Sequence, residues 1–450
     1  MGSNITEEIA RFCSEVQYND LTENAIEKVK VAITDTYGVI FTGYHEPVSD
    51  LLVKWIKDKQ GKGKSTILGY QLKTSASYAA LINGTMGHAI DYDDVSFSLR
   101  GHPSVLILPV VLAVGEKRES TGEEMILAFI LGTEVMVKLG RSMNPSHYLK
   151  GWHATATWGV IGAAVAAGKL YGFDKQKMKM VLGLAGSMAS GMRLNFGTMT
   201  KPFHVGYAAK NGVEAAELIN LGFTASNQIF DTGLSMFHLY GDEKNISIDD
   251  IQKWGKPWGI ENPGFDIKLY PCCSATHRAV DAMEMIIQRE RIDPNQVERI
   301  DCFAPFGSLA ALLYNKPQTG LEGKFSMQYV IAAMLVDQQL KIDSFTDEKV
   351  NRKIIQQLIP KIFTKETKAI KENRDIGDLG YIQLSIQMRN GKSIEEKVYY
   401  AKGSPNKCLS KVQLHCKFSD CLKSSTIING DKLFDQLMNL EKVEKINSLL

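Results

Sequence analysis

The chain has 450 residues, of which 44% are hydrophobic and 23% charged, and its net charge is +2. This composition predicts a soluble globular protein, and the length favours two domains. The small net charge and the lack of a long basic run argue against a nucleic-acid partner. No apolar segment is long enough to predict a membrane span, and the acidic, amphipathic N-terminal segment differs from a signal peptide. Seven irregularly spaced cysteines favour reduced thiols and a cytoplasmic location.

Apolar residues recur at three- and four-residue steps through most of the first 222 residues, which is a helical pattern. Pro103 and two overlapping capping boxes at 120–124 mark the starts of two of the expected helices. We predict helices over 5–17, 21–43, 75–91, 103–118, 122–143, 154–171, 174–192 and 204–222.

The pattern changes near residue 266. Three segments read as strands, and Asn390-Gly391 would close the last two into a hairpin. The expected strands and helices are strands 297–305, 381–388 and 393–401, helices 274–291 and 324–337, and a helical tail from about 405 that ends near 430–447. The sequence therefore predicts a mainly α protein. A large all-helical domain would cover 1–265 and 403–450, and a smaller α+β lid domain would be inserted at 266–402.

One segment, NGTMGHAIDYDDVSFSLRGHP at 83–103, concentrates ionisable side chains between apolar stretches. It contains two histidines, three carboxylates and one arginine, namely His88, His102, Asp91, Asp93, Asp94 and Arg100. Burial of so many ionisable groups is costly unless they are paired or used. We therefore expect a polar pocket at the edge of the helical layer.

Two further clusters precede small-residue helices. In GWHATAT, His153 stands where a helix end disfavours added positive charge, so its imidazole would be neutral. A capping histidine with a structural hydrogen bond is an equally good interpretation. In TKPFHVG, Lys201 and His204 lie at a helix start that suits a carboxylate ligand. The alternative for Lys201 is a solvated loop lysine.

The segment KLYPCCSATHR lies at the expected domain junction, where pockets often form. Its polar residues are Lys268, His277 and Arg278, whereas the adjacent cysteines lack the spacing of a zinc site. Tyr314 is a candidate proton donor, or a packing residue with a solvated hydroxyl.

Together these residues describe a site rich in cations and imidazoles. The sequence has no HExxH, GxSxG, P-loop or Rossmann motif, so we expect no metal and no cofactor. A small polyanionic acid fits such a site. Cations would hold its carboxylates and stabilise the enolate-like charge that develops when a proton moves on a neighbouring carbon.

The ordered motifs NGTMGHAIDYDD, GHPS, GWHATAT, TKPFHVGYAAKNG, YPCCSATH and FSMQY resemble the MmgE/PrpD family over roughly residues 5–400. This family includes 2-methylcitrate dehydratase, cis-aconitate decarboxylase and iminodisuccinate epimerase. The resemblance implies a homodimer and cofactor-independent chemistry on a di- or tricarboxylate.

Matched motif by motif, the resemblance places catalytic residues at Asp91, His102, His153, Lys201 and His277, with Tyr314 as a weaker match. We expect substrate contacts from Arg100, His204, Lys268 and Arg278. Where much of the family has a threonine followed by a histidine, this chain has Val95 and Ser96, so the substrate stays open.

We therefore expect a lyase that eliminates water or carbon dioxide beside a carboxylate. Lys201, His153 and His277 would bind carboxylates, while His102 and Asp91 would move the proton. An isomerase that returns the proton to the α-carbon of an imino-dicarboxylate would use the same residues. A non-catalytic carboxylate-binding protein with this fold is the third hypothesis.

Overall fold

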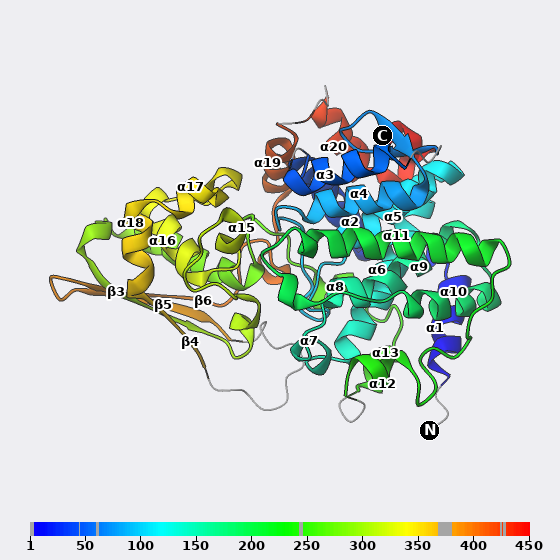
Figure 1. Ribbon diagram of the computed structural model, residues 1–450, viewed down its shortest axis with the longest axis horizontal. Coiled ribbons are helices and arrows are strands. Elements are labelled where there is room, and N and C mark those ends of the chain that lie inside the picture. The colour runs from blue at the N-terminus through cyan, green and yellow to red at the C-terminus, as the bar shows by residue number, and fades with distance from the viewer. Residues whose placement is uncertain are drawn as a thin grey trace.

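The computed structural model describes residues 4–44, 46–59, 63–242, 246–367, 380–423, 425 and 429–450. Helices predominate in these residues, which confirms the mainly α prediction. Figure 1 shows a large helical part beside a smaller part that contains a sheet. The proposal that the smaller part acts as a lid stays a prediction.

The large part contains helices from both ends of the chain. Those before the smaller part are α1 (Ile5–Glu15), α2 (Glu23–Thr42), α3 (Pro47–Lys57), α4 (Ala76–His88), α5 (Ser104–Arg118), α6 (Gly122–Ser142), α7 (Ser146–Leu149), α8 (Ala154–Thr157), α9 (Gly159–Leu170), α10 (Lys175–Ser187), α11 (Thr200–Asn220), α12 (Met236–Tyr240) and α13 (Ile248–Ile251). After the smaller part the chain returns in α19 (Lys411–Leu422) and α20 (Gly430–Met438). A short antiparallel hairpin, β1 (Ser65–Ile67) with β2 (Leu72–Thr74), was not predicted because three-residue strands are too short to show an alternating pattern.

The centre of the large part is a packed helical core. Every residue of α5 from Ser104 to Glu116 is buried, which explains why its sequence is apolar on all sides. Small residues allow the neighbouring helices to approach closely. A methyl group at Gly162 of α9 would lie 2.6 Å from the carbonyl oxygen of Gly132 in α6. Helix α9, which is rich in alanine and glycine, therefore lies deep in the bundle.

The smaller part has its own hydrophobic core around a four-stranded sheet. The strand order is β4 (Ile362–Glu366), β3 (Val297–Ala304), β5 (Ile382–Met388) and β6 (Ser393–Val398). The predicted hairpin of β5 and β6 is confirmed, with Gly391 at a φ of 84° in its turn. The parallel strand β4 was not predicted. The helices of this part are α14 (His277–Arg289), α15 (Gly320–Gly323), α16 (Met327–Asp337), α17 (Asp347–Val350) and α18 (Lys353–Leu358).

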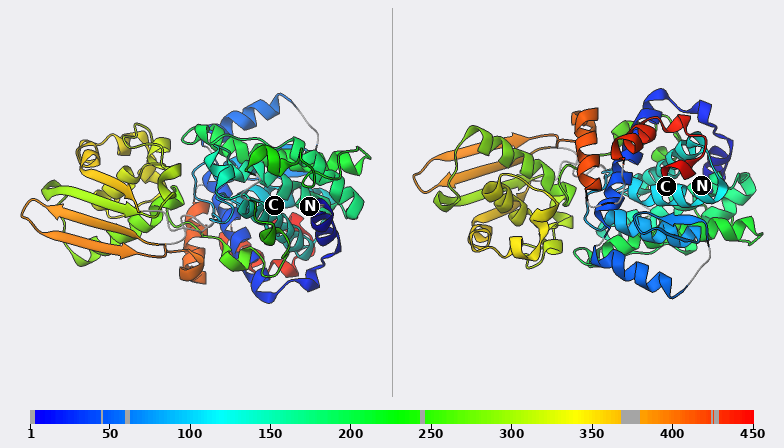
Figure 2. Two further views of the ribbon diagram at one scale, coloured as in Figure 1. Left: turned by 90° about the horizontal axis from the view of Figure 1, so that it is seen from below. Right: turned by 90° about the horizontal axis from the view of Figure 1, so that it is seen from above.

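The two parts lie side by side, and α19 lies at their junction in both views of Figure 2. An isolated antiparallel bridge between Val95 and Asp266 marks the place where the chain leaves the large part. None of the described helices is both long and apolar enough to cross a membrane.

Three helix boundaries near the expected site differ from prediction. Helix α4 ends at His88 rather than at 91, so the aspartates lie in a turn. Helix α11 begins at Thr200 rather than at 204, because Pro202 falls in the first turn, where a backbone N–H has no helical partner. The helix predicted over 154–171 is divided into α8 and α9 at Trp158.

We expect Gly206→Ala in α11 to destabilise the bundle. Its methyl group would lie 2.0 Å from the carbonyl oxygen of Leu81 in α4, so the two backbones would have to separate. The free energy of unfolding should fall by about 1–3 kcal/mol, measured by denaturant titration. The matched control is Gly233→Ala, whose methyl group meets no atom within 4 Å and should change stability by less than about 0.5 kcal/mol. Equal stability of the two variants would contradict the packing argument.

Candidate active site

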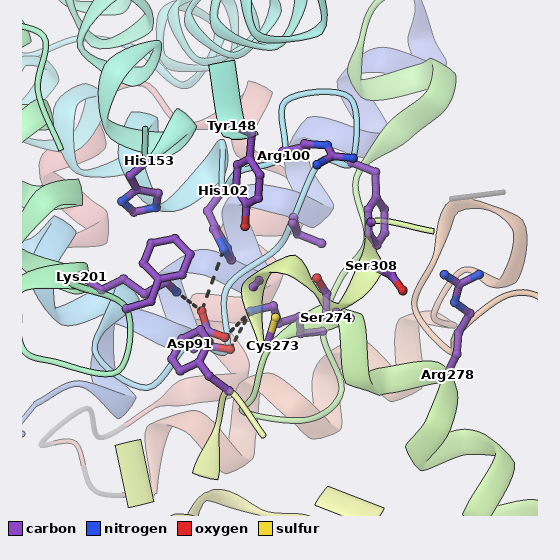
Figure 3. A pocket seen from close by; sticks show the side chains of 18 residues that line it. Asp91, Arg100, His102, Tyr148, His153, Lys201, Cys273, Ser274, Arg278 and Ser308 are labelled. Carbon is purple, nitrogen blue, oxygen red and sulfur yellow. Dashed lines mark hydrogen bonds and ion pairs between the residues drawn. The ribbon is translucent and has the colours of Figure 1, made fainter. Parts of the chain in front are cut away.

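A cavity lies where the large part meets the smaller part, and Figure 3 shows the side chains around it. Seven of the ten residues proposed from the sequence line this cavity, namely Asp91, Arg100, His102, His153, Lys201, Lys268 and Arg278. They come from the loop between α4 and α5, the starts of α8, α11 and α14, and the segment before α14. Distant parts of the chain therefore meet in one place, as the pocket hypothesis requires.

The other three proposed residues lie behind this lining. The Nδ1 atom of His204 is 3.2 Å from Nδ1 of His153. His277 lines a small neighbouring cavity, and its Nε2 is 3.2 Å from the carbonyl oxygen of Cys272. The hydroxyl of Tyr314 donates to the carbonyl oxygen of Phe196 at 2.9 Å.

Asp91 is the anionic centre of the cavity. It adopts a left-handed φ of 58°, which aspartate tolerates better than most residues. One carboxylate oxygen accepts a short hydrogen bond from the ammonium of Lys201, and the other lies 3.1 Å from that of Lys268. Burial disfavours the charge, but the two ammonium groups outweigh it and lower the pKa of Asp91 well below its usual range. The carboxylate is therefore ionised, and all three charges are buried.

A second carboxylate, Asp93, bridges two imidazoles. Its oxygens lie 2.9 Å from Nδ1 of His88 and 3.0 Å from Nδ1 of His102. Burial raises the pKa of an isolated carboxyl, but here the two imidazoles outweigh it and the pKa of Asp93 is far below normal. Burial lowers the pKa of His88 to about 3. Asp93 therefore remains an anion that orients both rings.

His102 has a defined tautomer. Its Nδ1 lies 2.9 Å from the carbonyl oxygen of Asp94, which can only accept a hydrogen bond, so Nδ1 carries the proton. Its Nε2 faces the carboxylate of Asp91 at 3.9 Å. Burial lowers the pKa of His102, so the ring is neutral near pH 7. His102 thus presents an unprotonated nitrogen at the cavity.

His153 occupies the N-cap position of α8 but makes no side-chain capping hydrogen bond. Burial, followed by the positive charge of Lys201, lowers its pKa well below the normal value. Its buried Nε2 has no hydrogen-bond partner among the described residues. Lys201 is also buried rather than solvated, with its ammonium 4.8 Å from the ring centre of Phe325. Lys201 is therefore not a solvated loop lysine, and His153 does not cap α8 with its side chain, although its Nδ1 lies 3.2 Å from Nδ1 of His204.

Sequence reasoning missed His88, Asp93 and the aromatic walls. His88 and Asp93 belong to the segment that had been singled out, but their pairing depends on where α4 ends. Tyr148, Phe196 and Phe325 line the cavity, and an isolated aromatic residue carries no sequence signal that distinguishes a cavity wall from a core residue.

Four side chains offer ligand atoms that all lie within 4.8 Å of one another, namely His88, Asp91, Asp93 and His102. Their chemistry suits a divalent cation in principle. However, the Asp91 carboxylate already binds two ammonium groups, and Asp93 is bonded to both imidazoles. A cation here would displace these bonds and lie beside two like charges, so the residues do not fit a metal site well.

The comparisons with known proteins define the class. The MmgE/PrpD N-terminal domain matches residues 7–249, and the MmgE/PrpD C-terminal domain matches residues 270–433. The chain therefore belongs to the MmgE/PrpD family, which confirms the resemblance seen in the sequence.

Particular relatives extend over the whole chain. A cis-aconitate decarboxylase from Homo sapiens is 28% identical over 465 residues, which cover 100% of this chain and 95% of the relative. The Mus musculus enzyme of the same name is 29% identical, with 100% and 94% covered. That of Aspergillus terreus is 26% identical, with 100% and 95% covered.

His277 should make stability depend on pH. Burial, followed by the charge of Lys268, lowers its pKa from 6.5 to about 3. Between these values the unfolded chain binds a proton that the folded chain does not, so stability falls as the pH drops below about 6.5. His277→Gln should reduce this dependence by up to about 1.4 kcal/mol per pH unit.

Denaturant titrations between about pH 4.5 and 7.5 measure this change. Glutamine can still donate to the Cys272 carbonyl, which limits the loss of packing and bonding. The same slope in wild type and His277→Gln would contradict the prediction.

Proposed function

We propose that the protein is a cofactor-independent lyase that decarboxylates an unsaturated tricarboxylate of the cis-aconitate type. The supporting observation is the charge of the cavity lining. Two lysines and two arginines line the cavity together with one carboxylate, so cationic side chains outnumber anionic ones in its lining. A tricarboxylate carries about three negative charges at neutral pH. The relatives named cis-aconitate decarboxylase support the same class of substrate.

The cations are spread around the cavity rather than clustered. Lys201 and Arg278 lie on opposite sides of it in Figure 3, and Arg100 lies above them. Such a distribution suits an acid with carboxylates on several carbons, because separate contacts fix its orientation. Low local dielectric strengthens each contact. His153 adds an unpartnered Nε2 that can donate to a carboxylate oxygen.

Decarboxylation requires a place for the electron pair that carbon dioxide leaves behind. In an acid of this type, the leaving carboxylate is attached to a carbon next to the double bond. When its C–C bond breaks, the electron pair moves through the double bond to the carbon beside a second carboxylate. Lys201 and Lys268 would stabilise the negative charge that develops there. A proton added to that carbon completes the reaction.

His102 is suited to supply this proton. Arrival of a trianion favours its imidazolium form, because nearby negative charge raises the pKa of a histidine. The carboxylate of Asp93 lies 3.0 Å from Nδ1 and would stabilise the added charge. The proton would be transferred from Nε2 to carbon, and a general acid of this kind typically contributes about 10²–10⁴ in rate.

One observation favours a second candidate function. The unprotonated Nε2 of neutral His102 is placed as a base, which is what removal of an α-proton requires. A dehydratase of a citrate-like hydroxy acid, or an epimerase, would begin in this way. Deuterium incorporation from solvent, together with the release of water or carbon dioxide, distinguishes these reactions.

The first test is incubation with cis-aconitate in deuterium oxide, followed by NMR. We expect release of carbon dioxide and one deuteron on the newly formed methylene group. A dehydratase would instead eliminate water from 2-methylcitrate without release of carbon dioxide. An epimerase would exchange a proton without net elimination. No reaction with any of these acids, while a control lyase is active, would contradict the proposal.

The second test is His102→Gln, which removes the proton donor and preserves ring-sized volume. We expect kcat to fall by about 10²–10⁴ with little change in KM, because the cations that bind the acid stay in place. His415→Gln is the control and should keep wild-type turnover, since His415 pairs with Asp431 at the surface. Wild-type kcat in His102→Gln would contradict the assigned role.

A further inference from the structure

The turn that follows α4 presents three successive backbone carbonyls to three buried lysines. The hydrogen bonds are Lys324 Nζ to Ile90 O at 2.8 Å, Lys268 Nζ to Asp91 O at 2.8 Å, and Lys417 Nζ to Tyr92 O at 3.0 Å. Carbonyls beyond a helix C-terminus lack helical partners and attract cations. We call Lys268, Lys324 and Lys417 the lysine clamp.

The clamp joins three separate elements. Lys324 follows α15 in the smaller part, Lys268 lies in the segment that connects the two parts, and Lys417 lies in α19. Lys268 also contacts the carboxylate of Asp91, so it belongs to the cavity lining. Lys417 pairs with Asp35 at 2.7 Å. Lys324 is the clamp residue that comes from the smaller part.

Lys324 is buried in an unusual way for a lysine, with an exposed fraction of 5%. Its ammonium donates to two carbonyl oxygens, those of Ile90 and Pro271 at 2.8 and 3.0 Å, and lies 4.8 Å from the ring centre of Phe345. None of the ion pairs between described residues includes Lys324, although the charges of Asp91 and Glu46 act on its ammonium from further away. A buried cation without a direct counterion is costly, so its position needs a compensating role.

The bond to Ile90 has a specific geometric effect. The Ile90 carbonyl belongs to the peptide plane whose rotation about the next N–Cα bond defines φ of Asp91. A donor fixed on this carbonyl therefore opposes a change in that angle. The left-handed φ of 58° costs about 1–2 kcal/mol for a residue with a Cβ, so it requires such support.

We propose that Lys324 is a positioning residue. It holds the turn in the left-handed conformation and thereby places the Asp91 carboxylate between Lys201 and Lys268. Contact between the smaller part and the turn is then coupled to the placement of the Asp91 carboxylate, because the Lys324 ammonium contributes to both. The effect on turnover rests on the proposed function, whereas the effect on the turn does not.

Lys324 also lines a second, larger cavity on the other side of the turn. Glu46, Phe345 and Lys417 contribute to the walls of this second cavity. A small amine that enters there could occupy the space left by a truncated lysine. Propylamine has the same heavy atoms that Lys324→Ala removes from the side chain. Restoration of activity in this variant by added propylamine therefore tests the role of the Lys324 ammonium.

The experiment compares wild type, Lys324→Ala and Lys138→Ala. Lys138 is another buried lysine, paired with Glu134 at 2.9 Å and outside both cavities, so its variant reports the general cost of removing a buried ammonium. In crystals of Lys324→Ala we expect Asp91 to leave the left-handed region and its carboxylate to move. With cis-aconitate, we expect kcat to fall by about 10–100-fold while KM stays within about threefold. Propylamine should restore part of kcat in this variant only.

An unmoved Asp91 in Lys324→Ala together with kcat within about twofold of wild type would overturn the proposal. An equal fall in kcat in Lys138→Ala would overturn it as well, because the loss would then be a general effect of instability. If Lys324→Ala does not fold, Lys324→Met, which keeps the side-chain volume, is examined by the same crystallographic and kinetic criteria. If wild type converts no carboxylic acid, the proposed function fails, while the position of Asp91 in the variant crystal still tests the clamp.

Discussion

The site depends on one buried carboxylate between two ammonium groups. Without Asp91, the charges of Lys201 and Lys268 would be buried together with no anion between them. Loss of one member of a buried ion pair typically costs about 3–5 kcal/mol, so the three residues are stable only as a set. The set also fixes the positions of the two lysines in the absence of a ligand, which the proposed function requires. Little reorganisation is then needed when negative charge develops on a bound molecule.

The architecture follows from the need to bring these charges together. Asp91 follows α4, Lys201 begins α11, and Lys268 lies in the connection to the smaller part. The close packing of α4 against α11, which Gly206 permits, places the first two side by side. The aromatic rings of Phe196 and Phe325 then cover the Lys201 ammonium. The small residues at the helix crossings therefore allow the charged side chains of the site to come together.

Much of this could be predicted from the sequence, and the remainder has physical reasons. Helical periodicity located most long helices, and ionisable residues among small or apolar neighbours located Asp91, His102, His153 and Lys201 at one cavity. The pattern could not show that α4 ends at His88, because tertiary bonds rather than local propensity fix that end. It gave no sign of Lys324, since a lysine that binds backbone carbonyls has no characteristic neighbours in sequence. For the same reason β4 was missed, because its pairing with β3 is wholly non-local.

The bridge made by Asp93 limits how many protons the histidines can hold. His88 and His102 both direct Nδ1 at this one carboxylate, and their ring centres are only 4.5 Å apart. One anion can balance one imidazolium, so protonation of either ring makes protonation of the other less favourable. The Asp93 carboxylate can therefore stabilise only one added proton on these two rings. In the proposed reaction, His102 would have to regain its proton from solvent before the next turnover, because His88 could not hold a second added proton in reserve.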